Sequence, residues 1–527
     1  MRNPDEVREK RFALASPGMI LALTSSFYII FILRTSFLIK GNLYFTLIDD
    51  AMISMRYARN LAQGYGLAWN PGQAPIEGFT NLGWVLWMTV LHLFPIPQEK
   101  ISLGVMLTSG IILLINIIVV FQISRLLAPA SRYAPAIAGT IVAFYFPLVF
   151  WSLRGMEVGA LTLMISLAIL LSLRLTLKAE NKVIPWLALS FIAALIIRMD
   201  SFIQVGLILL YLIGKRTLKF QTFAVLALSA SLTLLAVIVF QKSYFGDFLP
   251  NTYYLKVNGV SAIERIKTGL LVFNNYALGD FMMLLGFSLL GMALFKNMRT
   301  PEFTLLLGLF AAQSAYSIWV GGDYAEELVN SANRFITQGM PALIILFSLV
   351  MDRFIDAAGL ETLPGRFKQG FLPLAIVVGL GAVMVISGKQ WVNWYIDNAP
   401  MLKTDILRVK LGLHIRKYTS PKAVIAVHAA GQIPYYSERT TIDLLGKSDA
   451  VIAKGPLATA FAPGHDKWNY EYSILQLKPD LVADRFGQLT NFLSGVKEYQ
   501  LLPNGIYIRT GSKLFDPAGL SQDYKSP

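Results

Sequence analysis

The sequence of 527 residues contains no cysteine and little charge. The lack of cysteine excludes disulfides and thiolate metal sites. Charged residues make up 15% of the chain and hydrophobic residues 55%, whereas soluble proteins average about 25% charged. The four histidines (His92, His414, His428 and His465) are scattered and do not indicate a metal site. A P-loop, a Gly-x-Gly-x-x-Gly motif after a strand and a His-Glu-x-x-His motif are also missing.

Long apolar runs are present instead, from Pro17 to about Ile386. A helix needs ~20 apolar residues to cross a hydrocarbon core of ~30 Å. We therefore predict a polytopic α-helical membrane protein with about eleven transmembrane helices. The predicted spans are Gly18–Leu38, Leu103–Ile123, Ala134–Trp151, Val158–Leu173, Ile184–Ile197, Phe202–Ile213, Thr222–Phe240, Phe281–Phe295, Phe303–Trp319, Ile336–Val350 and Phe371–Ile386.

The distribution of basic residues predicts the orientation of these spans. The net charge is +14, and its Lys and Arg residues gather in loops on one side, as in cytoplasmic loops that face anionic headgroups. This explains the basic charge without nucleic acid. The first outer loop then covers residues 39–101, and its segment Asn81–Phe94 is a juxtamembrane helix, because a crossing there would break the charge alternation.

The composition changes at about Lys389 to that of a soluble domain. We predict a transmembrane domain over residues 1–388 and an extracytoplasmic α/β domain over 389–527. Ala423–Ala429 and Leu481–Ala483 are typical of strands, and Tyr499–Arg509 is typical of a hairpin that turns at Asn504-Gly505. Asp405–Tyr418 and Tyr470–Lys478 fit helices.

Asp49 and Asp50 form the most specific polar motif, directly after the first span. One of them can cap the helix that begins near Ala51, and Asp50 is the better placed for that. Capping does not explain the other carboxylate, which can act as a general base if burial and its neighbour raise its pKa. Arg56 lies about two turns further on and can share their face, unless it belongs to a solvated basic face.

Further polar candidates lie at the outer ends of other spans. Ionisable side chains at this depth indicate function, with buried ion pairs as the alternative. Arginine and lysine there are candidates to bind a lipid phosphate. The basic candidates are Arg198, Lys256 and Arg334, and the substrate-binding candidates are Glu157, Asp200, Asn251, Tyr253 and Asp323.

Together these motifs resemble the GT-C glycosyltransferases, and within them the terminal arabinofuranosyltransferases of the AftB type and related pilin arabinosyltransferases. The resemblance extends from Asp49 to Val482. The matching pieces are DDAMISMRYARNLAQGYGLAWNPG, EGFTN, RGMEV, RMD, YFGDFLPNTYYLK, GGD…NRF, AGQIPYYS, TIDLLGKSD, APGHDK and LKPDLV. The stretch before Arg334 is longer and more acidic than the family pattern, and the C-terminal domain is smaller.

The resemblance implies a bacterial inner-membrane enzyme with a GT-C fold and an active site that faces the periplasm. It would transfer a sugar, D-arabinofuranose, from a polyprenyl-phosphate donor with inversion, and Asp49 or Asp50 (Asp49 by preference) would be the base. The scheme requires no cofactor, although a divalent cation is compatible with it. The acceptor is left open between a glycan and a glycoprotein such as pilin. A transporter or lipid-linked sugar flippase is the alternative, and inverted repeats would favour it.

Overall fold

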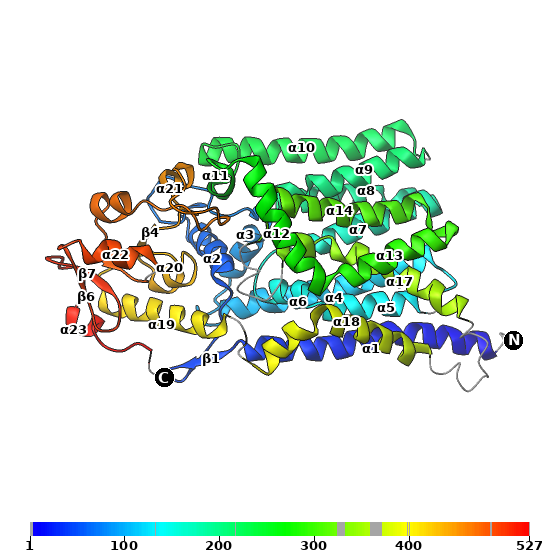
Figure 1. Cartoon of the computed structure of the whole chain (residues 1–527), viewed down its shortest axis with the longest axis horizontal. Helices are drawn as coiled ribbons and strands as arrows, with labels where there is room; N and C mark the ends of the chain where they lie inside the picture. Colours follow the sequence, from blue (N-terminus) through cyan, green and yellow to red (C-terminus); the bar gives the residue numbers. More distant parts are fainter. Residues whose placement is uncertain are drawn as a thin grey trace.

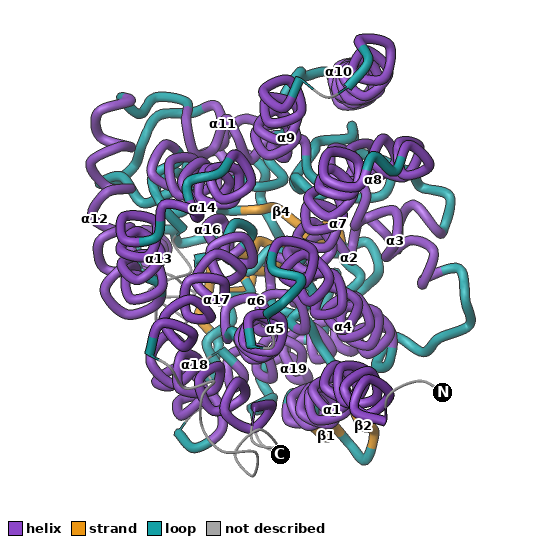
Figure 2. The backbone as a smooth tube through the Cα atoms, turned by 90° about the vertical axis from the view of Figure 1, so that its right-hand side faces the viewer, coloured by secondary structure: helices purple, strands orange, loops and turns teal. Residues whose placement is uncertain are grey.

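The computed structural model describes residues 4–131, 133–216, 218–323, 333–358, 371–397, 399, 401–484 and 487–525. Long helices run side by side through one end of the molecule, and a smaller α/β domain occupies the other end (Figure 1). Figure 2 views the bundle along its helices, with α10 at the rim beside α8 and α9. The bundle helices are α1 (Pro4–Arg34), α4 (Ile101–Leu127), α5 (Ala134–Phe144), α6 (Phe146–Leu153), α7 (Val158–Lys178), α8 (Ile184–Ile197), α9 (Phe202–Lys215), α10 (Phe220–Phe245), α12 (Ala262–Asp280), α13 (Met282–Leu294), α14 (Pro301–Trp319), α17 (Met340–Ala357) and α18 (Phe371–Tyr395).

Several of these helices are long and apolar enough to cross a membrane. Among the described residues four qualify singly: α4, α7, α10 and Leu374–Tyr395 of α18. The pair α5 and α6 adds a fifth, and shorter apolar helices include Gly18–Arg34, Asn181–Ile197 and Met282–Leu294. The chain is thus a multi-pass helical membrane protein, and the number of about eleven spans stays a prediction.

The span predicted over Ala134–Trp151 is broken. Helices α5 and α6 meet at Tyr145 with a bend of 48°. Pro147 lies in the first turn of α6, and proline has no N–H to continue the ladder of α5. The freed N–H of Phe146 donates to Ser387 Oγ of α18 at 3.1 Å. The break is therefore satisfied inside the bundle rather than by water.

Short elements form a layer between the bundle and the α/β domain. They are β1 (Phe37–Ile39), β2 (Asn42–Tyr44), α2 (Asp49–Ala62), α3 (Leu82–His92), α11 (Asn251–Val257) and α16 (Arg334–Thr337). Helix α3 has 11 residues, about half the ~20 that a span requires, which agrees with its prediction as a juxtamembrane helix. Helix α2 packs against both α3 and the α/β domain.

The α/β domain is built on a five-stranded sheet with the order β4-β3-β5-β7-β6. Strand β3 pairs in parallel with β4 and β5, while β7 is antiparallel to β5 and β6. The predicted hairpin is present as β6 and β7. The elements are α19 (Leu402–Tyr418), β3 (Val424–Val427), α20 (Gln432–Ser437), β4 (Thr440–Asp443), α21 (Ala450–Lys454), a π-helical turn (Glu471–Gln476), β5 (Leu481–Val482), α22 (Gln488–Ser494), β6 (Tyr499–Leu501), β7 (Tyr507–Arg509) and α23 (Pro517–Leu520).

The two parts are joined more tightly than the predicted boundary implies. Helix α18 continues through Lys389 to Tyr395, so the soluble domain begins about ten residues later than expected. Arg154, at the end of α6, forms a buried ion pair with Asp405 of α19. Gln432 also donates to Asp405, at 2.7 Å. A buried charge is stable only when it is paired in this way, so these residues fix the domain to the bundle.

Candidate functional site

Asp49 and Asp50 form the first turn of α2. The residue that precedes the helix is Ile48, which has no side-chain oxygen, and no side chain caps this helix. The prediction that one of the two aspartates is the cap is therefore wrong. Both carboxylates lie instead beside the free N–H groups of the helix start, where negative charge is favoured. Neither carboxylate is therefore occupied as a helix cap, and both bind partners elsewhere in the chain.

Asp50 lies between two cations from distant parts of the chain. Its Oδ2 is 2.9 Å from Arg334 Nη1, and its Oδ1 pairs with Lys447 Nζ. Arg334 Nε is also 3.0 Å from Asp323 Oδ2, and its guanidinium lies over the ring of Trp151. Burial raises the pKa of Asp50, but Lys447 and Arg334 outweigh it, so the pKa falls well below its ordinary value. Asp50 is thus held as a carboxylate.

Lys256 adds a third cation to this cluster. Its Nζ lies 5.3 Å from the centre of the Phe335 ring. Burial, and then the neighbouring Arg334, lower the pKa of Lys256 to about 8. We call Asp50, Lys256, Asp323, Arg334 and Lys447 the Asp50 cluster. Its three cations face two carboxylates, so the cluster carries an excess of positive charge and fits an anionic ligand.

Lys447 was not singled out from the sequence, although it lies in the motif TIDLLGKSD. Its loop is anchored by Asp443 at the end of β4, whose carboxylate accepts from the N–H of Leu445 at 3.0 Å and of Ser448 at 2.7 Å. Asn251 Nδ2 donates to the carbonyls of Gly446 and Lys447, at 2.8 and 3.0 Å. Asn251 therefore holds the loop that carries Lys447, rather than pointing to a substrate as predicted.

The carboxylate of Asp49 faces the other way, toward the α/β domain. Its oxygens accept from the N–H of Gln432 at 2.9 Å and of Gly431 at 3.3 Å. Arg408 Nη1 of α19 is 4.0 Å from Asp49 Oδ1. Burial raises the pKa of Asp49 above its ordinary value, against the opposing effects of Arg408 and the Gln432 N–H. Of the two aspartates, Asp49 is consequently the stronger base.

Arg198 forms ion pairs with both Glu157 and Asp200. Arg198 Nη1 is 2.7 Å from Glu157 Oε1, and its Nε and Nη2 are 3.0 and 2.5 Å from the two oxygens of Asp200. Asn81 donates to the other oxygen of Glu157, and Tyr316 donates to Asp200 Oδ2, which also accepts from Arg198. This is the buried ion pair that the sequence left as the alternative. The predicted roles of Arg198 in phosphate binding and of the two acids in substrate binding are not supported, since their polar atoms are already committed.

Two other predicted residues do not reach the Asp50 cluster. Arg56 is buried and donates to the carbonyls of Trp69, Pro434 and Arg439 and to Asn70 Oδ1, at 2.6 to 2.8 Å. It therefore ties α2 to the α/β domain and is neither a phosphate ligand nor part of a solvated face. Tyr253 is exposed, and its ring packs on Tyr254. These contacts leave no support for either predicted role.

An apolar groove of about 720 Å³ lies between α10 and the ends of α2, α3 and α8. Leu61, Leu86, Ile196, Ala236 and Phe240 are among the residues that line it. Near the C-terminal end of α10, the hydroxyl of Tyr244 accepts a hydrogen bond from the N–H of Leu67. One turn away on α10, Gln241 donates to the buried Glu77 at 3.2 Å.

Glu77 connects this groove to the loop of Lys447. Its carbonyl accepts from the N–H of Asn251 at 3.0 Å, and the next residue, Gly78, packs against Ser448. A short chain of contacts therefore leads from the groove to the Asp50 cluster. Burial raises the pKa of Glu77 to about 8.

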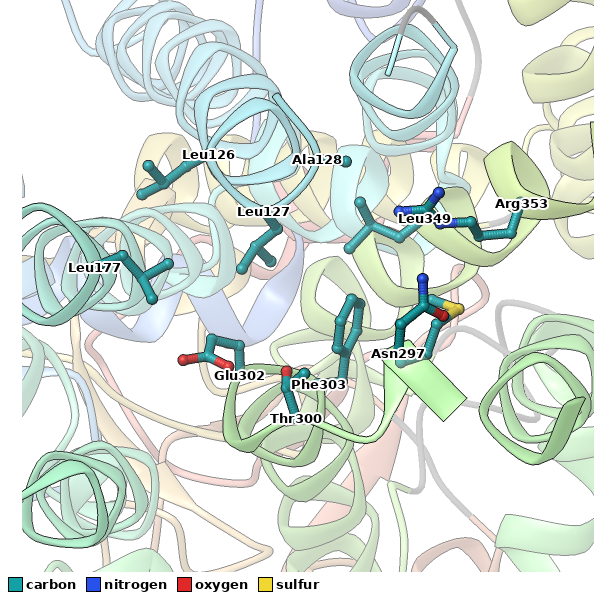
Figure 3. Close-up of a pocket in the computed structure, with 11 residues that line it drawn as sticks. Leu126, Leu127, Ala128, Leu177, Asn297, Thr300, Glu302, Phe303, Leu349 and Arg353 are labelled. Atoms are coloured by element: carbon teal, nitrogen blue, oxygen red, sulfur yellow. The ribbon is translucent and has the colours of Figure 1, made fainter. Parts of the chain in front are cut away.

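A second cavity, of about 220 Å³, lies where the ends of α4, α7, α14 and α17 meet (Figure 3). Its lining includes Leu177 at the end of α7 and Arg353 of α17, together with Glu302. Glu157 precedes the opposite end of α7, and its charge interacts with Arg334 of the Asp50 cluster. At 1.5 Å per residue, Leu177 lies ~30 Å along the helix from Glu157. In the described part of the chain, no group of three histidines or acids is placed to hold a metal ion.

Comparison with known proteins shows the fold class. Residues 399–520 match a family described as a domain of unknown function, DUF8728. No curated protein matches the sequence. The solved structure of ArnT from Cupriavidus metallidurans bound to undecaprenyl phosphate is similar with a TM-score of 0.58 and 11% identity, over 95% of this chain and 98% of that chain. The oligosaccharyltransferase of Archaeoglobus fulgidus in the apo form is similar with a TM-score of 0.56 and 11% identity, over 95% and 74%.

At this level of identity, the likeness establishes the fold and nothing finer. The chain has the GT-C architecture that these two proteins share, in agreement with the sequence prediction. Neither protein's description mentions arabinofuranose, so the donor sugar stays a prediction. What the chain does must be argued from its own side chains.

Proposed function

We propose that this protein is a membrane glycosyltransferase that takes its sugar from a polyprenyl-phosphate donor. The observation that carries the proposal is the Asp50 cluster, where Lys256, Arg334 and Lys447 surround two carboxylates. This excess of cations suits a single phosphate group, and Arg334 can bind two of its oxygens. ArnT, which has the same fold, is described as bound to undecaprenyl phosphate.

The apolar groove supports a lipid donor rather than a soluble sugar phosphate. A polyprenyl chain is a long flexible hydrocarbon, and burying it against Leu86, Ile196 and Phe240 is favourable at about 25 cal/mol per Å². The chain of contacts through Gln241, Glu77 and Ser448 leads from the groove to Lys447. A donor with its tail in the groove can therefore place its phosphate at the Asp50 cluster.

In the proposed reaction, an acceptor hydroxyl attacks the anomeric carbon of the donor sugar. The new bond joins this carbon to the acceptor oxygen, and the bond from the carbon to the phosphate oxygen breaks, so that polyprenyl phosphate leaves with inversion. Asp49 takes the hydroxyl proton, for which its raised pKa suits it. Arg334, Lys447 and Lys256 stabilise the charge on the departing phosphate. The scheme requires no cofactor.

We extend the proposal to the particulars that the resemblance implies. The sugar is D-arabinofuranose, and the acceptor is a glycan or glycoprotein of the cell envelope. The enzyme lies in the bacterial inner membrane with its site toward the periplasm, which the gathering of basic residues in loops on the opposite side supports.

The test is a transfer assay with purified protein in nanodiscs, a panel of polyprenyl-phosphoryl pentoses and hexoses, and arabinoside acceptors. We expect Asp49→Asn to lower the turnover by about 10²–10⁴-fold while polyprenyl phosphate still binds. Full transfer by both Asp49→Asn and Asp50→Asn would overturn the assignment of the base. Transport of the lipid without transfer would favour the flippase.

The phosphate site has its own test in two lysines, Lys447 before α21 and Lys454 at its last residue. Lys447→Met should weaken polyprenyl-phosphate binding at least tenfold, because a hydrogen bond to a charged group is worth about 1.5–3 kcal/mol. Lys454→Met is the matched control, since Lys454 is exposed and pairs with Asp247 at the surface. Equal binding by the two variants would place the phosphate elsewhere.

A further inference from the structure

The parallel part of the C-terminal sheet has a topological switch point. Strand β3 lies between β4 and β5. The chain runs from β3 to β4 on one side, and from β5 to the edge strand β6, beyond β7, on the other side. In open α/β sheets, ligands bind outside the carboxyl ends of strands at such a point. His428 follows β3 here, and Asp484 follows β5 after one intervening residue. Asp484 accepts from the N–H of His428 at 2.7 Å.

This end of the sheet meets the proposed base. The loop after β3 supplies the N–H groups of Gly431 and Gln432 that bind Asp49. Arg408 faces the same point from α19, and its charge interacts with Asp49, Asp405, Asp484 and Asp50. Asp405 is already committed to Arg154 and Gln432. Asp50 is likewise paired with Arg334 and Lys447, so Asp49 and Asp484 are the carboxylates that remain beside Arg408.

The geometry of α2 separates this site from the phosphate. Consecutive residues on a helix point about 100° apart. Accordingly, Asp50 faces Arg334 and Lys447, while Asp49 faces the sheet. A displacement with inversion needs the nucleophile and the leaving group on opposite sides of the anomeric carbon. The two aspartates thus mark two sides of one reaction centre.

The side chains at the sheet end suit a neutral sugar. The side chains of Arg408, Asp484 and Asp49 are 29%, 21% and 15% exposed, so a ligand can reach them. Two carboxylates beside one guanidinium disfavour a second phosphate. The carboxylates can accept hydrogen bonds from hydroxyl groups, and the guanidinium can donate to them. Tyr470, which is buried, lies edge-on to His428 and is stacked on Trp468. Trp468 is partly exposed and so offers an aromatic surface against which the apolar face of a sugar can pack.

We infer that the carboxyl end of β3 and β5 is the acceptor subsite, which binds a sugar residue of the acceptor and delivers one of its hydroxyls to Asp49. Arg408 donates to the hydroxyls of this sugar, and Asp484 accepts from them. The inference assigns a role to the DUF8728 region, and it rests on the proposed function.

The experiment separates acceptor effects from donor effects. Arg408→Gln and Asp484→Asn should each raise the KM for an arabinoside acceptor about tenfold or more, as expected for a lost hydrogen bond to a charged group. The KM for the donor and the binding of polyprenyl phosphate should stay unchanged. Arg416→Gln, on the same helix but at the surface against Glu438, is the matched control. An unchanged acceptor KM in both variants would overturn the inference and leave the proposed function standing.

A second readout does not depend on turnover. Saturation-transfer NMR would measure the binding of octyl arabinofuranoside and a linear arabino-oligosaccharide to the full chain in nanodiscs, without donor. We expect a signal from the wild type and from Arg416→Gln, and a loss of signal in Arg408→Gln. If no donor supports transfer but these sugars bind in an Arg408-dependent way, the proposed function fails and the subsite stands. The absence of binding by the wild type would refute the subsite.

Discussion

Asp49 and Asp50 are adjacent in the chain, yet their surroundings give them different chemistry. Two cations hold Asp50 as a carboxylate, while Asp49 has one arginine at 4.0 Å and two backbone donors. A carboxylate that is strongly paired is a poor base, and one with a raised pKa is a better base near neutral pH. The preference for Asp49 from the sequence is retained, but its reason changes from capping to pairing.

The two aspartates should therefore respond differently to the same substitution. Asp50→Asn removes the negative charge between Arg334 and Lys447, so we expect polyprenyl phosphate to bind more tightly, by about tenfold, which is about 1.4 kcal/mol. Turnover should fall, because the two cations lose the group that orients them. Titration of the nanodisc protein with polyprenyl phosphate measures the first effect. Weaker binding than in wild type would contradict this expectation. It would mean that Asp50 helps to bind the phosphate, by holding a donor that both groups share.

Glu77 makes the free energy of unfolding fall as the pH rises, which is the opposite of the effect of a carboxyl group with a lowered pKa. Burial raises the pKa of Glu77 from 4.5 to about 8, so between these values the folded protein holds a proton that the unfolded chain has lost. The free energy of unfolding then falls as pH rises from about 5 to 8, by up to about 1.4 kcal/mol per pH unit. We expect Glu77→Gln, which can still accept from Gln241, to raise the Tm relative to wild type by an amount that grows over this range.

Thermal unfolding in nanodiscs at several pH values measures this difference. Glu264→Gln is the control, because it removes a carboxylate that is exposed in the first turn of α12 rather than buried. A constant difference between Glu77→Gln and wild type from pH 5 to 8 would argue against a protonated Glu77.

At the scale of elements, the sequence predicted what local patterns encode. Apolar runs located the core of most bundle helices, and Asn504-Gly505 located a hairpin, because both signals lie within one segment. The strand Thr440–Asp443 was missed, since four residues with two threonines carry little periodicity. Helix α12 was missed because it mixes charged and apolar residues without a long apolar run. The bend at Tyr145 was not predicted, because the N–H that it frees binds Ser387, which is distant in the sequence.

Helix α10 is the element on which the lipid part of the proposal depends. Ala236→Trp should fill part of the groove and raise the KM for a donor with a full-length polyprenyl chain, with little effect on a short-chain analogue. Val239→Trp is the control, because Val239 lies on the same helix, is 56% exposed and does not line the groove. Transfer assays with both donors measure the difference. An equal effect of Ala236→Trp on long and short donors would show that the tail lies elsewhere.

At the scale of the whole molecule, the site exists only where the bundle and the α/β domain meet. Asp50 and Arg334 belong to the segments that flank the bundle, whereas Lys447, Arg408 and the N–H donors to Asp49 belong to the α/β domain. The sequence could locate the acids and bases of the first group at span ends. The ion pair of Asp50 with Lys447 could not be predicted from the sequence, because it depends on the packing of two domains and leaves no local pattern.

Gly431 is where this packing is closest, and it provides a test of the junction. Its φ is an ordinary −103°, but a Cβ at this position would lie 1.8 Å from the carbonyl oxygen of Asp49. Gly431→Ala must therefore push the loop after β3 away from α2. Because a displacement of ~1 Å at a reaction centre costs about 10²-fold, we expect turnover to fall by about that factor. Polyprenyl phosphate should still bind, since Arg334 and Lys256 are held by other elements.

The matched substitution is Gly495→Ala, in the same domain at a similar φ of −90°, where the nearest atom to an added Cβ is 3.5 Å away. It should leave transfer unchanged, so a loss specific to Gly431→Ala reports on the junction rather than on the stability of the domain. Comparable turnover in the two variants would mean that α2 and the loop after β3 can separate without harm. The domain would then be an appendage to a catalytic bundle that is complete by itself, and the assignment of the acceptor side to the sheet would fall with it.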